Sequence, residues 1–160
     1  AYAVIVDRYQ DTIYNLALRM VHDPDDAEDV AQVVFVKAFE RLGTFDPKYR
    51  FFSWLYRIAM NESLNFLRQR KPFQRFDEMR GAEELKEEPD PQEAAGEVEE
   101  ALKVLSEDQR AVVVLKHLEG FSYAEIGQML NISEKKVKSR LFSARQILRD
   151  VLVKKGMGTR

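Results

Sequence analysis

The chain has 160 residues, a formal net charge of −2 and 45% hydrophobic residues. This composition is typical of one ordinary globular domain or two small ones, and it excludes disorder throughout. The absence of cysteine excludes disulfides, thiolate metal sites and cysteine nucleophiles. No apolar run approaches the roughly twenty residues of a membrane helix, and Asp7 and Arg8 interrupt the first apolar stretch, so we expect neither membrane insertion nor a signal peptide. The helical pattern starts at Ala1, which leaves open a truncation there.

Helical spacing dominates the sequence and no convincing alternating strand is present, so we predict an all-α fold. The first helix is expected to bury one apolar stripe, formed by Val4, Tyr9, Ile13, Leu16 and Met20. A second helix is expected to start at Pro24, directly after the cap Asp23, and to run to about Leu42, with Gly43 as its stop.

A third helix is predicted from the cap Ser53 to about Lys71, where Pro72 is expected to end it. Residues 77–100 then carry eleven acidic and two basic side chains, a net charge of −9, together with two prolines. This pattern predicts an extended acidic linker at residues 72–92. The fold class we expect is therefore two small helical domains, residues 1–71 and 93–160, joined by an acidic flexible linker.

The C-terminal domain has the arithmetic of a helix-turn-helix between Phe121 and Arg149. A short helix ends at a tight break, Asn131–Ser133, and a longer helix runs to about Val153. We expect Val137, Leu141, Ala144 and Leu148 to face the core. Capping boxes predict two helix starts in this domain, at Ser106 with Gln109 and at Ser122 with Glu125.

The last helix carries a net charge of +6 over residues 133–155. Lysine and arginine reach phosphates and guanine edges, and an apolar ring can lie against a thymine methyl. We therefore predict a DNA-reading face that includes Phe142, which sits among charges and outside the apolar stripe. The alternative is that Phe142 packs on a neighbouring helix and the basic residues are only solvated.

Two further surfaces stand out in the N-terminal domain. From Val30 to Phe39 the second helix is apolar nearly all round, which indicates a protein interface or, alternatively, a central core helix. On the third helix a polar stripe follows the mixed basic and aromatic segment 48–52. Rings beside cations suit unpaired bases, although the rings can equally be core and the stripe solvated. The stripe consists of Trp54, Arg57, Asn61, Asn65 and Arg68.

These segments resemble the extracytoplasmic-function group of the sigma-70 family of bacterial RNA polymerase sigma factors. Residues Asp26–Asp29, with Gln32 and Phe35, are similar to the second conserved region, and Trp54–Ala59 with Asn61 to the promoter-melting region. The segments 118–127 and 137–141, with Ala144 and Arg145, resemble the family helix-turn-helix. The resemblance covers about residues 2–71 and 93–153.

The resemblance implies a promoter-recognition protein of the cytoplasm that needs no cofactor, is not an enzyme and binds the clamp coiled coil and flap of bacterial core RNA polymerase. An anti-sigma factor is an expected further partner. Polymerase would be bound by Asp29, Gln32, Val33, Phe35 and Val36. The −10 element, melted to single strands, would be held by Lys48, Tyr49, Phe51, Trp54, Arg57, Asn61, Asn65 and Arg68. The duplex −35 element would be read by Lys135, Lys136, Lys138, Ser139, Arg140, Phe142, Ser143 and Arg145.

Two departures from the family pattern affect these assignments. Val33 stands where glutamate is frequent, and Glu134–Lys136 replaces small residues at the head of the recognition helix. A stand-alone helix-turn-helix regulator is the alternative function, but it explains only the C-terminal half. A small hydrolase or nuclease is disfavoured, because no carboxylate cluster, nucleophile–base pair or phosphate loop is present. We expect His22 and His117 to be helix-end or surface side chains rather than metal ligands.

Overall fold

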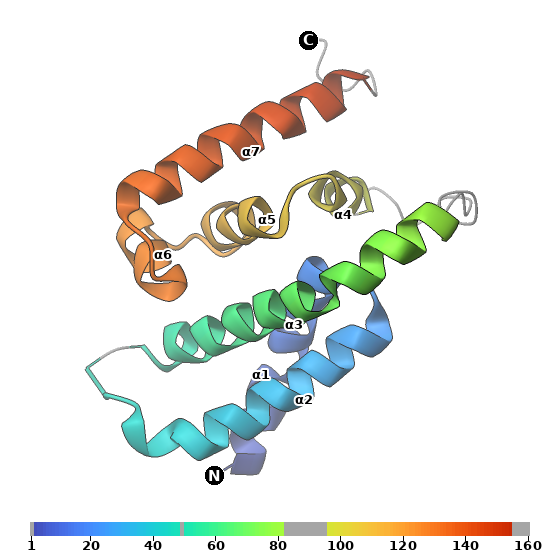
Figure 1. Ribbon diagram of the computed structural model, residues 1–160. Helices are drawn as coiled ribbons and strands as arrows, with labels where there is room; N and C mark the ends of the chain where they lie inside the picture. The colour runs from blue at the N-terminus through green and yellow to red at the C-terminus, as the bar shows by residue number, and fades with distance from the viewer. Residues whose placement is uncertain (1, 49, 82–95, 155–160) are drawn as a thin grey trace.

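The computed structural model describes residues 2–48, 50–81 and 96–154, and every regular element in these ranges is helical, as predicted. Helices α1, α2 and α3 form one group, and α4 to α7 pack against it (Figure 1). The elements are α1 (Tyr2–Val21), α2 (Pro24–Arg41), the 3-10 turn η1 (Leu42–Thr44), α3 (Phe51–Gly81), α4 (Gly96–Lys103), α5 (Glu107–Val113), the π turn η2 (Val114–Leu118), α6 (Tyr123–Leu130) and α7 (Glu134–Lys154).

Helix α1 buries most of its predicted stripe against α2 and α3. The side chains of Ile13, Leu16 and Met20 are fully buried, and Tyr9 is partly buried. The prediction is wrong for Val4, which is 65% exposed. Apolar periodicity therefore predicted the face that packs, but not where along α1 the neighbouring helices cease to cover it.

The predicted helix starts are confirmed. The carboxylate of Asp23 accepts from the backbone N–H of Asp25 at 2.9 Å, and Pro24 occupies the first turn of α2, where its missing N–H costs nothing. Both capping boxes are complete, with reciprocal bonds between serine and the residue three positions later. These signals are local in sequence, which is why they can be found without the fold.

The predicted end of α2 near Leu42 is confirmed, because the helix ends at Arg41 with Leu42 as its C-cap. The chain does not stop turning at Gly43, however, which lies inside the 3-10 turn that follows, and the predicted start of α3 is wrong. Helix α3 begins before Ser53, because the N–H of Trp54 already donates to the carbonyl of Arg50 at 3.2 Å. The serine therefore lies within the first turn of α3 and is not its cap.

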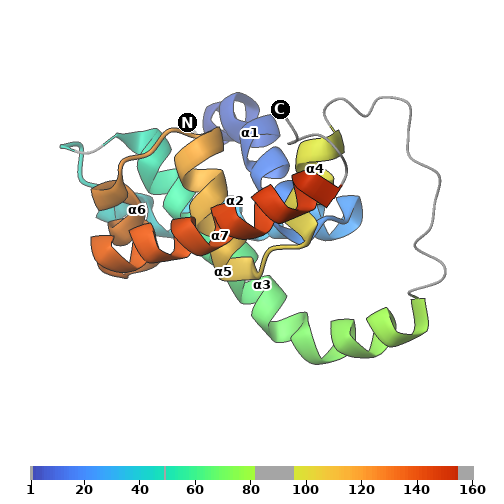
Figure 2. The same cartoon turned by 90° about the horizontal axis from the view of Figure 1, so that it is seen from above.

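Helix α3 also continues through Pro72, where we predicted its end, and reaches Gly81. A proline removes one backbone donor and bends a helix, but it does not have to stop it. Figure 2 shows the last part of α3 turning away from the first part. The predicted linker is thus helical over residues 72–81, and its remainder, residues 82–92, lies outside the described residues.

The helix-turn-helix is confirmed. Helix α6 ends at Leu130, its C-cap Asn131 adopts the left-handed conformation (φ 58°), and α7 packs Val137, Leu141 and Ala144 into the core. Gly127 permits the tight turn, because a Cβ atom there would lie 2.8 Å from the backbone oxygen of Ile132. The chain order of short helix, turn and long helix is that of DNA-binding helix-turn-helix units.

The two groups of helices share one continuous hydrophobic core. The ring of Phe121, just before α6, lies against the rings of Phe52 and Tyr56 on α3, with centroid distances of 6.1 and 5.6 Å. The guanidinium of Arg19 on α1 lies 3.6 Å from the carboxylate of Glu99 on α4. The N-terminal and C-terminal halves are therefore closed against each other, and we call this the closed arrangement.

His22 lies at the junction between the halves. It follows α1 in the left-handed conformation (φ 59°), and its N–H donates to the carbonyl of Leu18 at 2.8 Å. Burial, together with the positive charges of Arg110 and Lys103, lowers the pKa of His22 from 6.5 to about 3. The ring is consequently neutral in the folded protein at neutral pH.

This lowered pKa predicts a loss of stability in acid. Below pH 6.5 the His22 ring is protonated in the unfolded chain, whereas in the folded chain it stays neutral until the pH approaches 3. Stability therefore falls through this window, by up to about 1.4 kcal/mol per pH unit from this residue. We expect His22→Asn, which tolerates a left-handed backbone and does not titrate, to flatten the dependence. Urea unfolding measured across the window checks this, and parallel curves for the two proteins would contradict it.

Candidate nucleic-acid and polymerase interfaces

The predicted −35 face of α7 is on the surface. Arg140 is half-buried, and the other predicted residues are exposed, namely Lys135, Lys136, Lys138, Ser139, Phe142, Ser143 and Arg145. The side chain of Phe142 is 64% exposed, so it does not belong to the core that α7 shares with its neighbours. A phenyl ring left in water among cations has an apolar surface available for a ligand, such as the methyl group of thymine.

Residues from η2 and α6 hold parts of this face in place. Arg145 Nε and Nη2 lie 3.2 and 3.1 Å from Nε2 of His117, which is in the π turn. The ring of Tyr123 at the start of α6 lies beneath two ammonium groups, those of Lys116 at 4.5 Å and Lys138 at 5.3 Å. Reasoning from sequence missed these supports, because the partners are separated by up to 28 residues.

The predicted −10 stripe of α3 faces two environments. Arg57 and Asn65 are exposed. The side-chain amide of Asn61 donates to the backbone carbonyl of Met129 on α6 at 3.1 Å, and Arg68 Nη2 lies 3.2 Å from Asp108 Oδ1 on α5. In the closed arrangement the stripe is thus partly occupied by the C-terminal half.

The aromatic part of the predicted −10 site forms a cluster at the start of α3. Phe45, Phe51 and Trp54 lie in mutual contact, with ring centroids 5.3 to 5.4 Å apart, and Lys48 is exposed at the edge of the loop. Tyr49, also assigned to this site, lies outside the described residues.

A cleft of about 910 Å³ opens between this cluster and the helix-turn-helix. The loop and the start of α3 form one wall, with Lys48, Arg50, Trp54 and Arg57 beside the acidic Asp46. Helix α6 and its C-cap form the other wall, with Glu125, Gln128 and Asn131. Basic and aromatic side chains around one hollow are suited to an unstacked nucleobase and its phosphate. The cleft in its closed form combines residues from both halves.

The exposed side of α2 is apolar at its centre. Val33 and Val36 are 43% and 54% exposed, and Asp29 and Gln32 are also on the surface. Phe35, which we assigned to polymerase binding with them, is instead 5% exposed and packs in the core. The ring faces inward because it lies on the same side of the helix as the buried Ala31 and Ala38.

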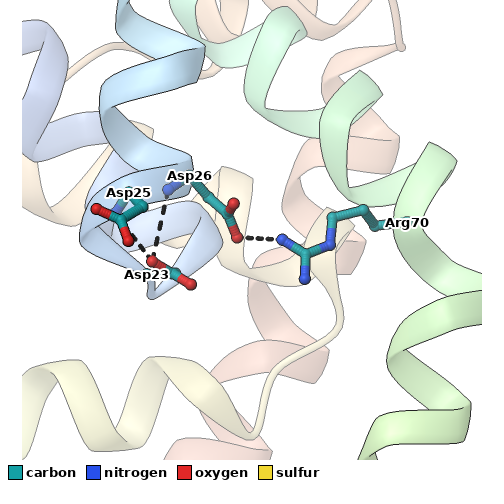
Figure 3. A network of polar contacts seen from close by, with 4 residues as sticks. All are labelled: Asp23, Asp25, Asp26 and Arg70. Atoms are coloured by element: carbon teal, nitrogen blue, oxygen red, sulfur yellow. Dashed lines mark hydrogen bonds and ion pairs between the residues drawn. The ribbon is translucent and has the colours of Figure 1, made fainter.

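The acidic start of α2 has a structural role. Asp26 forms an ion pair with Arg70 of α3, and Asp23 caps the helix beside it (Figure 3). The Arg70 guanidinium also lies over the ring of Phe66, 5.3 Å from its centroid. The contacts fix the first turn of α2 against α3, and so orient the exposed face that carries Val33 and Val36.

Arg110 is a second structural residue that reasoning from sequence missed. Its side chain is buried, with 8% exposure, and donates to three backbone carbonyls: Leu102 at 2.9 Å, Leu105 at 3.1 Å, and Met20 at the end of α1. Burial lowers the pKa of Arg110, and the nearby charge of Glu107 opposes that shift. One guanidinium thereby links the C-terminal half to the last turn of α1.

The described part of the chain contains no group of three or more His, Asp or Glu side chains that could hold a metal ion. Within the same residues, no helix has the length and apolarity needed to span a membrane.

Comparisons with known proteins agree with this two-part organisation. A family model described as Sigma-70 region 2 matches residues 5–73, and one described as Sigma-70, region 4 matches residues 95–148. The ECF RNA polymerase sigma factor SigW of Bacillus subtilis is 36% identical over 95% of this chain and 89% of its own length. The RNA polymerase sigma-H factor of Pseudomonas aeruginosa is 35% identical over 92% of this chain and 84% of its own.

Solved structures share the fold. CnrH, in complex with the cytosolic domain of CnrY, is 28% identical with a TM-score of 0.67, over 94% of this chain and 86% of that one. RpoE of Bartonella quintana, in complex with the anti-sigma factor NepR, has a TM-score of 0.70 at 23% identity, over 94% and 96% of the two chains. The second likeness is one of fold alone.

Proposed function

Because the chain belongs to the extracytoplasmic-function (ECF) group of sigma-70-family factors, we propose that it binds core RNA polymerase in the cytoplasm and directs it to promoters. The observation that carries the proposal is the exposed face of α7, on which the ring of Phe142 lies among several cations and outside the core. The proposal assigns the chain no reaction of its own. A stand-alone helix-turn-helix regulator would leave the region 2 match over residues 5–73 unexplained.

We assign different contacts with polymerase and promoter DNA to different helices of the chain. The exposed face of α2, with Asp29, Gln32, Val33 and Val36, docks on the polymerase clamp, and the C-terminal half meets the flap. Helix α7 reads the −35 element in duplex DNA. The stripe of α3 and the cleft beside it hold unpaired −10 bases, which requires the closed arrangement to open, because Asn61 and Arg68 are engaged by α6 and α5.

Control by an anti-sigma factor is part of the proposal. The similar protein CnrH was solved with a protein partner, the cytosolic domain of CnrY, bound to it. The exposed valines of α2 and the interface between the two halves are the surfaces of this chain on which such a partner would act.

Gel filtration of the chain with purified bacterial core RNA polymerase tests the proposal. We expect co-elution in a one-to-one complex that supports promoter-dependent run-off transcription. A chain that stays separate from core polymerase, in a preparation that binds another sigma factor, would overturn the proposal and favour the stand-alone regulator.

The α2 face gives a sharper form of this test. Val36→Glu places a charge in the centre of the proposed interface, where its desolvation opposes docking, and we expect core polymerase to bind about tenfold more weakly. Val104→Glu is the matched control, because Val104 is similarly exposed, at 51% against 54%, but lies between α4 and α5. Titration of core polymerase with labelled chains measures both. Equal losses for the two variants would contradict the assignment of the α2 face.

Phe142 gives the corresponding test for DNA. Phe142→Ala removes an exposed ring, so we expect unchanged folding and unchanged polymerase binding, but about fivefold less discrimination among −35 sequences. Run-off transcription from promoter fragments substituted base by base at −35 measures this discrimination. If polymerase binding falls together with discrimination, the ring supports the fold and does not read DNA.

A further inference from the structure

One arginine of the proposed −35 face is held by a single histidine. Arg145 Nε and Nη2 both lie within hydrogen-bonding distance of His117 Nε2, at 3.2 and 3.1 Å. A guanidinium can only donate, so Nε2 is the acceptor and the neutral imidazole carries its proton on Nδ1. Partial desolvation at the surface lowers the pKa of His117, and the charges of Arg145 and Lys116 lower it further, which keeps the ring in this accepting form at neutral pH.

The contact uses one particular edge of the guanidinium. Arginine has five N–H donors, and its plane offers two bidentate edges, one formed by Nε with Nη2 and the other by Nη1 with Nη2. His117 occupies the Nε edge of Arg145. The Nη1–Nη2 edge is left for a ligand, and bidentate pairing of this kind is how arginine recognises two coplanar acceptors.

The position of the pair places this free edge on the proposed DNA face. Arg145 lies three residues after Phe142 and seven after Lys138, so the three share one side of α7, and all three are exposed. His117 comes from η2, a π turn of five residues just before the helix-turn-helix. Turns of this kind are rare in proteins, but those that occur are frequently found at functional sites.

Resting on the proposed function, we propose that His117 is a positioning residue for DNA recognition, which turns the Nη1–Nη2 edge of Arg145 toward a bidentate acceptor in the −35 duplex. That acceptor is either the O6 and N7 atoms of one guanine or two oxygens of one phosphate, which present the same chemistry. Without the imidazole, the arginine side chain samples several rotamers, and its conformational entropy is lost when it binds DNA.

Three variants separate the roles. Arg145→Ala identifies the base pair or phosphate that the arginine contacts, because binding to that group is lost in this variant. His117→Leu removes the acceptor but keeps a side chain of similar bulk, and His117→Gln restores an acceptor, since its amide oxygen is as many bonds from Cβ as Nε2 of histidine. His117 is exposed, so we expect unchanged unfolding temperatures for its variants.

The experiment is a selection of −35 duplexes from a randomised pool by the full chain bound to core RNA polymerase, followed by affinity measurements on the selected duplex at several salt concentrations. If a guanine is read, His117→Leu weakens preference about fivefold or more, at the position where Arg145→Ala abolishes it. If a phosphate is bound, both variants weaken all sequences equally and lower the salt slope by about one. In either case His117→Gln stays within about twofold of the parent.

Other outcomes overturn the inference. If His117→Leu behaves as the parent while Arg145→Ala is impaired, the histidine does not position the arginine, and the proposed function stands. If His117→Gln is as impaired as His117→Leu, the accepting atom is not the cause. If the parent chain enriches no −35 sequence at all, the proposed function fails, and the inference fails with it.

Discussion

Replacing Arg110 with methionine is expected to lower the free energy of unfolding by about 3 kcal/mol, because a buried polar group left without its hydrogen-bond partner costs about 1–3 kcal/mol. The guanidinium satisfies the carbonyls of Leu102, Leu105 and Met20, and methionine fills similar space without any donor. Three acceptors at the ends of α1 and α4 would then be buried without a hydrogen-bond partner from this side chain, and each such loss is costly. Urea denaturation followed by circular dichroism measures the effect.

The matched control is Arg41→Met, because Arg41 ends α2 on the surface and its change should stay within about 0.5 kcal/mol. Arg110→Lys adds a test of geometry, since an ammonium keeps the charge but lacks the planar fork that reaches several carbonyls at once. We expect it to recover only part of the lost stability. Full recovery by lysine, or a loss for methionine no larger than the control, would mean that the fork is not what joins the halves.

Sequence reasoning predicted the features whose causes are local. Capping by Ser106 and Ser122 depends on residues three positions apart, and the exposed ring of Phe142 follows from helical periodicity on α7. The resemblance added the order of the two halves, which the region 2 and region 4 matches confirm. The individual assignments to polymerase and DNA stay predictions.

The features that were missed depend on tertiary contacts. From Val30 to Phe39 helix α2 is apolar on nearly all sides, so its sequence does not say that Phe35 packs inward while Val36 remains 54% exposed. Arg110 looks like any helical arginine until the carbonyl of Met20, 90 residues away, is placed beside it. Pro72 was expected to end α3, but a bent helix is an alternative that a proline also permits.

The closed arrangement makes its own prediction about promoter opening. Asn61 and Arg68 belong to the proposed −10 site, yet they are bound to α6 and α5. The valines of α2 are exposed in the same arrangement. Core polymerase should therefore be able to dock on a closed chain, whereas −10 capture should require the two halves to separate. Docking and promoter opening are thus expected to respond differently when the halves are locked together.

A cleavable cross-link between Arg68→Cys and Asp108→Cys tests this separation, because these side chains are exposed, lie in contact across the halves, and the chain contains no other cysteine. If a short dithio-bismaleimide holds the open form to about 1% of molecules, the apparent affinity for a −10 bubble falls about 100-fold. We expect the locked protein still to co-elute with core polymerase, and cleavage of the linker to restore open complexes to the level of the unlinked double variant, which controls for loss of Arg68. Equal promoter opening before and after cleavage would show that the −10 site works without separation of the halves. If the locked protein no longer co-elutes with core polymerase, the halves must separate before docking.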